Sequence, residues 1–128
     1  MQTPQFRSFK TSSGKLVLFG KSSSSNEDLM KIKKPNDFIL HTNDPGSPFC
    51  IINKNADKKD LKEGAIVCAS FSQQWKKKKK TGKVSIFKGK DVYKNKKAKI
   101  GTFHVKKYLK IIKVKLELFI GFQDSQIK

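Results

Sequence analysis

Residues 57–75 read DKKDLKEGAIVCASFSQQW, and this stretch has the apolar pattern that predicts the longest helix of the chain. Its apolar side chains recur at spacings of three and four, so they share one wide buried face. Asp57 is the expected N-cap, and Asp60 lies close enough to the helix start to interact favourably with the helix dipole. Gly64 predicts close packing against a strand, because glycine in a helix interior costs about 1 kcal/mol relative to alanine. We expect the helix to end in the run of lysines at 76–80.

The residues before this helix predict a β-hairpin, a short helix and two more strands. The expected strands are 6–10, 15–19, 37–41 and 49–52. The first two flank the polar turn TSSG and therefore form the hairpin. Ser24 and Glu27 have the spacing of a capping box, which places the short helix at roughly 25–32, and Pro35 stops it.

The last third of the chain predicts strands at 84–87, 99–105 and 110–120. In the last of these, Ile112 and Val114 alternate with Lys113 and Lys115, so one face belongs to the core and the other to solvent. A chain of 128 residues is expected to bury one core. We therefore predict an α/β (α+β) fold: a single domain over residues 1–122 whose mixed, largely antiparallel sheet is packed by one long and one short helix. A flexible tail is expected at 123–128.

The composition is strongly basic, with 29 Lys and Arg against 10 Asp and Glu and a net charge of +19. Solubility of a small domain requires a net charge of only roughly 2 to 8 in magnitude, so a polyanion is the natural partner. Arg7 is the only arginine. Compositional drift toward lysine would also produce this skew, whereas phosphate-gripping sites usually favour arginine. The charge therefore indicates an anionic partner without naming it.

The sequence predicts no metal, cofactor or catalytic site. Cys50 and Cys68 are the only cysteines, and neither belongs to a C-x-x-C pair or lies near a histidine at metal-ligand spacing, so both are expected to be buried. The chain lacks a Gly-rich phosphate loop, a nucleophile triad and paired carboxylates, which argues against an enzyme. The N-terminus has no apolar signal region, and no stretch approaches the roughly 18 apolar residues of a membrane span. We expect a cytoplasmic protein without membrane insertion.

Several short blocks of sequence occur in an order that resembles a known family. They are Gly20-Lys21, Asn26-Glu27-Asp28-Leu29, Asp37-Phe38-Ile39-Leu40-His41, Pro45-Gly46-Ser47, Val84-Ser85-Ile86-Phe87 and Ala98-Lys99-Ile100-Gly101. Together with the long helix they resemble the NFACT-R domain, the presumed RNA-binding module of ribosome-quality-control factors. Larger members carry further N-terminal domains, so this chain is similar to the short stand-alone members. Pro48 and Ile100 replace the family's usual histidine and proline, and no role of that histidine is carried over.

The candidate nucleic-acid-binding residues fall into two basic loops and two polar sites. The lysines expected to neutralise phosphates are Lys76, Lys77, Lys78, Lys79, Lys80, Lys94, Lys96, Lys97 and Lys99. Lys21 and Asn26 flank the capped helix, whose N-terminal amides favour an anion. Asp37 and His41 are either structural, as a turn cap and a strand-end histidine, or polar contacts to a phosphate or ribose. A solvated charged surface without a partner is the alternative for the lysines.

The resemblance implies RNA binding, with tRNA or rRNA, or the ribosome itself, as the partner and a role in translation or ribosome quality control. Lysine contacts to phosphates do not read the 2′-hydroxyl, so DNA remains an alternative. A second alternative is an adaptor that docks on an acidic protein or an anionic membrane surface. An RNA-processing enzyme that uses His41 is a third, and it would show turnover that His41→Ala abolishes.

Overall fold

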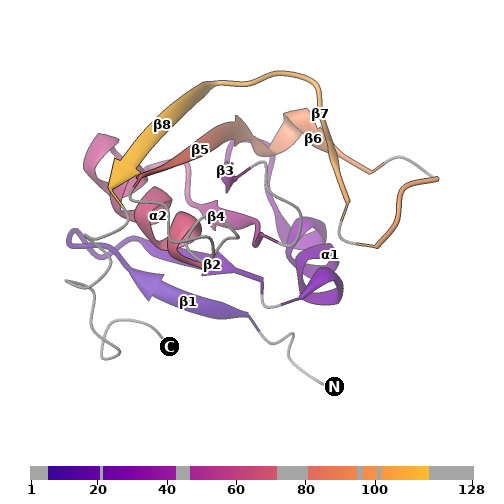
Figure 1. Ribbon diagram of the computed structural model, residues 1–128, viewed down its shortest axis with the longest axis horizontal. Coiled ribbons are helices and arrows are strands. Elements are labelled where there is room, and N and C mark those ends of the chain that lie inside the picture. Colours follow the sequence, from indigo (N-terminus) through magenta and orange to yellow (C-terminus); the bar gives the residue numbers. More distant parts are fainter. Residues whose placement is uncertain are drawn as a thin grey trace.

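The computed structural model describes residues 6–20, 22–42, 47–71, 81–94, 97–100 and 102–115. Eight strands, two α-helices and one short 3-10 helix are defined there (Figure 1). In chain order they are β1 (Arg7–Lys10), β2 (Leu16–Phe19), α1 (Ser23–Ile32), β3 (Phe38–His41), β4 (Cys50–Ile52), α2 (Lys58–Ser70), β5 (Thr81–Lys88), η1 (Gly89–Asp91), β6 (Val92–Tyr93), β7 (His104–Val105) and β8 (Lys110–Lys115).

Six of these strands form one sheet in the order β1-β2-β4-β3-β5-β8, and every pairing between them is antiparallel. Strands β6 and β7 pair separately as a two-stranded ribbon. The predicted fold class is confirmed: an α+β domain with an antiparallel sheet, one long helix and one short helix. The predicted tail at 123–128 lies outside the described residues and stays a prediction.

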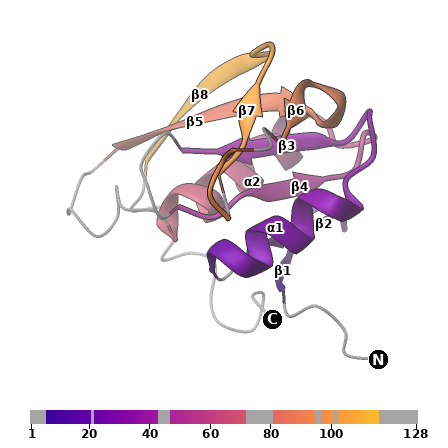
Figure 2. The same cartoon turned by 90° about the vertical axis from the view of Figure 1, so that its right-hand side faces the viewer.

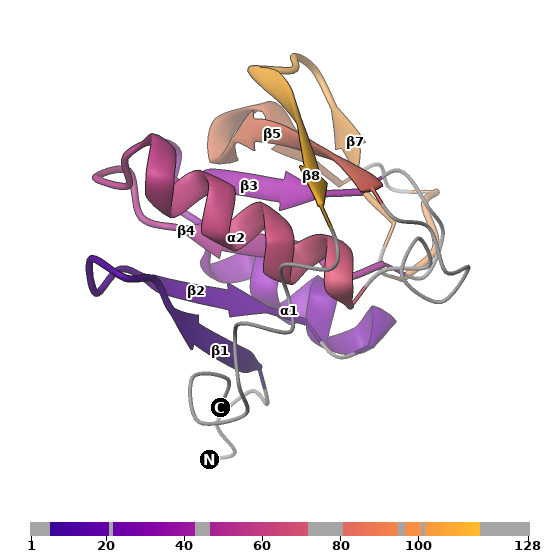
Figure 3. The same cartoon turned by 60° about the vertical axis from the view of Figure 1, so that its left-hand side comes forward.

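Both faces of the sheet are covered. Helix α2 lies across one face, as Figure 3 shows, and α1 lies on the other beside the β6–β7 ribbon (Figure 2). The α2 side buries Leu40, Ile52 and Ile86 from the sheet, and the α1 side buries Ile39, Ile51 and Phe87. Alternate residues of a strand point to opposite faces, so neighbouring residues of β3 and β4 enter different clusters. Strand β4 is therefore buried at every position.

Helix α2 begins where the sequence predicts and ends earlier. The Asp57 side chain accepts a hydrogen bond from the Asp60 N–H (2.9 Å), and the Asp60 side chain accepts one from the Asp57 N–H (3.1 Å). Gly64 packs directly on the side chain of Ile52, which confirms its predicted contact with a strand. The expected end in the lysine run is wrong, because α2 stops at Ser70. Phe71 is the C-cap, and its ring turns onto Phe19, with ring centroids 5.1 Å apart.

Helix α1 begins earlier than predicted. Its N-cap is Ser22, whose hydroxyl accepts from the Ser25 N–H (3.2 Å), while the Ser25 hydroxyl accepts from the Ser22 N–H (2.8 Å). The predicted pair of Ser24 and Glu27 is therefore not the capping box. Four consecutive serines offer similar caps, and the register is selected by Asn26, which is buried and bonded to the Phe49 N–H.

The predicted strand at 99–105 is wrong for most of its length. Among its described residues, only His104–Val105 pairs, with β6, and the sequence pattern missed both β6 and η1. The carbonyls of Lys99 and Thr102 accept hydrogen bonds from the Lys94 ammonium, and not from the backbone of a neighbouring strand. Strand β8 alternates as expected within its described part, with Val114 buried and Lys113 exposed.

Cys50 and Cys68 are free and buried, as expected. Burial raises the pKa of the Cys50 thiol well above its ordinary value, and the neighbouring Cys68 adds to the rise. Within the ranges that the structure describes, no helix is long and apolar enough to cross a membrane.

Candidate nucleic-acid interface

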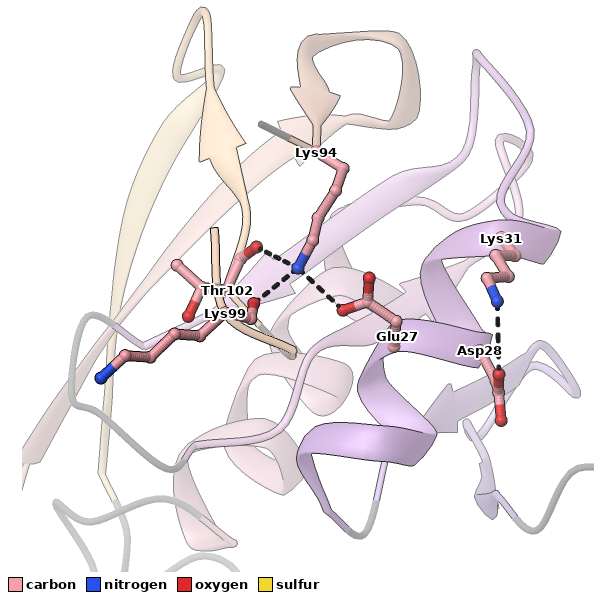
Figure 4. A network of polar contacts seen from close by, with 6 residues as sticks. All are labelled: Glu27, Asp28, Lys31, Lys94, Lys99 and Thr102. Carbon is pink, nitrogen blue, oxygen red and sulfur yellow. Dashed lines mark hydrogen bonds and ion pairs between the residues drawn. The ribbon is translucent and has the colours of Figure 1, made fainter. Parts of the chain in front are cut away.

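Lys94 lies at the centre of a polar cluster that joins the β6–β7 ribbon to α1 (Figure 4). Its ammonium donates to the Glu27 carboxylate (3.0 Å) and to the carbonyls of Lys99 (2.5 Å) and Thr102 (3.1 Å). A lysine ammonium has three N–H donors, so these contacts use all of them. The Lys94 and Glu27 side chains are only 31% and 21% exposed, which reduces solvent screening of the pair. Lys94 thus fastens the loop that carries Lys99 to the first half of α1.

We call the three hydrogen bonds of the Lys94 ammonium the Lys94 clamp. A chain of contacts between aromatic rings continues from the clamp to the end of β3. The Lys94 ammonium lies 4.9 Å from the centroid of the Phe103 ring, and Phe103 meets Phe49 edge-on at 5.4 Å. Phe49 in turn stacks on His41, with centroids 4.0 Å apart and planes 9° from parallel. We call this group the hairpin site, after the antiparallel β6–β7 pair. It consists of Glu27, His41, Phe49, Lys94, Lys99 and Phe103.

Asn26 is a structural residue beside this site. It is 7% exposed, and its side-chain oxygen accepts from the Phe49 N–H (3.1 Å). Gly20 packs against the Asn26 side chain and donates its own N–H to the Phe49 carbonyl (3.2 Å). Asn26 therefore fixes the backbone of Phe49, whose ring stacks on His41. The side-chain amide of Asn26 is itself buried, away from any ligand that arrives from solvent.

Asp37 lies at the other end of β3 from His41, so the strand separates these two candidates. Its carboxylate accepts from the Lys34 N–H (2.9 Å), and its carbonyl accepts from the Gly89 N–H (2.8 Å). Asp37 therefore caps a turn, which is the structural one of the two roles that the sequence allowed. Four residues of extended strand span roughly 13 Å, which is too far for the carboxylate to orient the imidazole.

The structure brings together Asn26, His41, Lys94 and Lys99 from the predicted set, and Lys97 lies exposed in the same loop as Lys99. Figure 4 shows the Lys99 side chain extending away from the polar cluster. The remaining candidates lie outside the described residues: Lys21, Lys76, Lys77, Lys78, Lys79, Lys80 and Lys96. That the lysines at 76–80 and those at 94–99 lie on one side of the molecule stays a prediction.

Three residues of the hairpin site were not identified from the sequence. Phe49 and Phe103 have the pattern of ordinary core residues, and Glu27 was assigned to a cap that does not form. No sequence spacing links Glu27 to Lys94, because the contact spans 67 positions. No group of three or more His, Cys, Asp or Glu in the described part of the chain could hold a metal ion.

The fold is shared with a solved structure, the C-terminal part of the fibronectin/fibrinogen-binding protein from Streptococcus suis. The match has a TM-score of 0.80 at 19% sequence identity and covers 90% of this chain and 47% of that one. This chain thus spans about half the length of that structure. No curated protein matches the chain.

A sequence family matches most of the chain. The family is described as the NFACT protein RNA binding domain, and the match covers residues 5–107, from just before β1 to just after β7. It includes every described residue of the hairpin site and supports a nucleic-acid-binding role. The chain belongs to the NFACT RNA-binding domain family.

Proposed function

We propose that this protein binds structured RNA, either tRNA or rRNA, through lysine–phosphate contacts around the hairpin site, and that it does so without catalysis. A role in translation or ribosome quality control, in the cytoplasm, accords with this activity. The family match supports binding of nucleic acid, and the charge of +19 supports a polyanion as the ligand.

The observation that carries the proposal is the Lys94 clamp. All three donors of its ammonium are used within the protein, so we assign Lys94 to positioning the loop, in which the exposed Lys97 and Lys99 are the candidate phosphate contacts. A loop held in place before binding loses less conformational entropy when the ligand arrives. The loop is also fastened close to the start of α1, whose first turn contains no acidic residue and carries the positive end of the helix dipole.

Salt dependence of tRNA binding tests the proposal. If about six phosphates are contacted along a single strand, log Kd should change with log salt with a slope of about 4 in magnitude. The double variant Lys97→Gln/Lys99→Gln should bind more weakly and reduce the slope by about 1.4. The control Lys58→Gln/Lys59→Gln removes the same charge from exposed positions at the start of α2 and should change the slope little.

A third variant separates the clamp from simple electrostatics. Glu27→Ala raises the net positive charge, so long-range attraction alone predicts tighter binding. Loss of the clamp predicts weaker binding, by up to about 5-fold, because a partly exposed ion pair contributes at most about 1 kcal/mol. A wild-type slope below about 1 in magnitude, or equal losses in the two double variants, would contradict the proposal. DNA of the same sequence and vesicles of anionic lipid are the probes for the alternative partners.

A further inference from the structure

The β6–β7 ribbon has a second face that the hairpin site does not use. Val92 pairs with Val105 and Tyr93 pairs with His104. Val92 is 2% exposed and packs in the α1-side cluster, and Val105 packs against the same cluster. Since side chains alternate along a strand, Tyr93 and His104 stand on the opposite face. Both are exposed, and 43% of Tyr93 is accessible to solvent.

The two outward rings form a cross-strand pair. Their centroids are 5.7 Å apart and their planes are tilted by 31°. The Lys106 ammonium lies 5.6 Å from the centroid of the Tyr93 ring. An exposed aromatic pair with a neighbouring cation is the arrangement on which bases of single-stranded nucleic acid stack. The pair is fixed by the strand register, and the Lys106 N–H also bonds to the Asp91 carbonyl (2.8 Å), so the surface exists before a ligand binds.

The charge around this pair selects the class of ligand. Residues 88–110 contain nine lysines, and Asp91 is their only acidic residue. An apolar protein surface would gain nothing from this charge, whereas a nucleic-acid strand supplies phosphates for the lysines and base faces for the rings. Lys90, Lys106 and Lys107 are exposed in the described part of this segment, and Lys106 lies beside the Tyr93 ring.

We propose that Tyr93 and His104 form a stacking surface for unpaired bases of RNA, while lysines of the same segment contact the adjoining phosphates. The inference rests on the proposed function and adds to it a preference for single-stranded over duplex regions. Duplex RNA keeps its base faces stacked on one another, so only its phosphates are available to the ribbon.

The test compares a 12-nucleotide oligo(U) with a 12-base-pair RNA duplex by fluorescence anisotropy at fixed salt. Tyr93→Ala and His104→Ala should each weaken oligo(U) binding at least about 5-fold, while duplex binding changes less than about 2-fold. Tyr93→Phe keeps the ring and should bind as the wild type does. Ile32→Ala, which removes an exposed apolar side chain from the end of α1, is the matched control.

The outcomes distinguish this inference from the proposed function. Salt-dependent binding of both probes by the wild type, with no loss in either alanine variant, would overturn the stacking surface and leave phosphate binding intact. Equal losses on both probes would also overturn it. If the wild-type protein bound neither the oligo(U) nor the duplex, both proposals would be overturned. Ultraviolet cross-linking of the wild-type protein to oligo(U) gives a readout without mutation: adducts should occur at Tyr93 or His104, and adducts confined to other peptides would contradict the inference.

Discussion

Asp60 shows how one buried side chain can connect distant parts of the chain. It is 1% exposed, and its carboxylate accepts hydrogen bonds from the hydroxyls of Ser13 (2.5 Å) and Thr11 (2.7 Å) in the β1–β2 turn. The Asp57 N–H is a third donor. One turn further along α2, Glu63 accepts from the hydroxyl and N–H of Ser12 (2.6 and 3.1 Å). These carboxylates fasten the first hairpin to the start of α2.

The hydrogen bonds to Asp60 make folding stability depend on acidity. The Ser13 hydroxyl, the Asp57 N–H, the Thr11 hydroxyl and the charge of Lys15 lower the pKa of Asp60 from 3.8 to about 2, although burial opposes the shift. The unfolded chain therefore binds the proton more readily than the folded chain does. The resulting stabilisation is complete above the unfolded pKa of 3.8 and is lost as the pH falls through about 2.

Asp60→Asn should lower the free energy of unfolding by about 1–3 kcal/mol at pH 7, because buried donors lose a charged acceptor. It should also flatten the dependence on pH between about 4 and 2. Urea unfolding at a series of pH values measures both effects. Asp28→Asn is the control: the Asp28 carboxylate makes an exposed contact with Lys31 at 3.9 Å and should contribute less than about 0.5 kcal/mol (Figure 4). An unchanged pH profile in Asp60→Asn would contradict the role assigned to Asp60.

At the scale of elements, α1 illustrates how a tertiary contact decides where a helix begins. Residues 22–25 are four serines, and each is a suitable N-cap on local grounds. Asn26 is buried against Gly20 and bonded to Phe49, which fixes the rotation of the helix and places Leu29 and Met30 in the core. In that rotation Ser22 is the residue with extended backbone at the cap.

Substitution of two serines in this run tests the assignment. Ser22→Ala should destabilise the protein by about 1 kcal/mol, because the Ser25 N–H loses its side-chain acceptor. Ser24→Ala, at the cap position that the sequence predicted, should change stability by less than about 0.5 kcal/mol. Chemical denaturation of the two variants under identical conditions compares them. A larger effect at Ser24 than at Ser22 would show that the helix begins later in solution.

At the scale of the whole molecule, the charge of +19 acts on stability as well as on binding. Like charges repel in the compact state, so screening salt should raise the midpoint of thermal unfolding. A polyanion that binds only the folded chain should raise it further, by mass action.

At low salt, tRNA should therefore raise the midpoint temperature of thermal unfolding. At a free RNA concentration of 100 times Kd, the stabilisation is about 2.7 kcal/mol. The shift should shrink as salt rises, because each lysine–phosphate contact weakens with salt. An acidic polypeptide of matched charge is the control for attraction that depends on charge alone. Equal shifts with both polyanions would indicate that the ligand is not recognised as nucleic acid.

The sequence by itself determined the features that depend on neighbouring residues. Runs of apolar and β-favouring residues predicted the first hairpin, β3, β4 and β5. Helical periodicity predicted α2, alternation predicted the described part of β8, and the Asp57 cap and the Gly64 contact were confirmed. Those signals are local, because burial of one face repeats with the period of the element. The family resemblance was likewise confirmed, by a match over residues 5–107.

Only the tertiary structure decided the features that depend on contacts between distant residues. The Lys94–Glu27 clamp spans 67 positions and removes the carbonyls of Lys99 and Thr102 from a strand that the pattern had predicted. The position of Asn26 against Phe49 selected the start of α1, and the pairing of Tyr93 with His104 created the exposed aromatic surface. A side chain whose partner lies far along the sequence leaves no periodic signal, so the sequence alone did not reveal that the Lys94 ammonium binds Glu27.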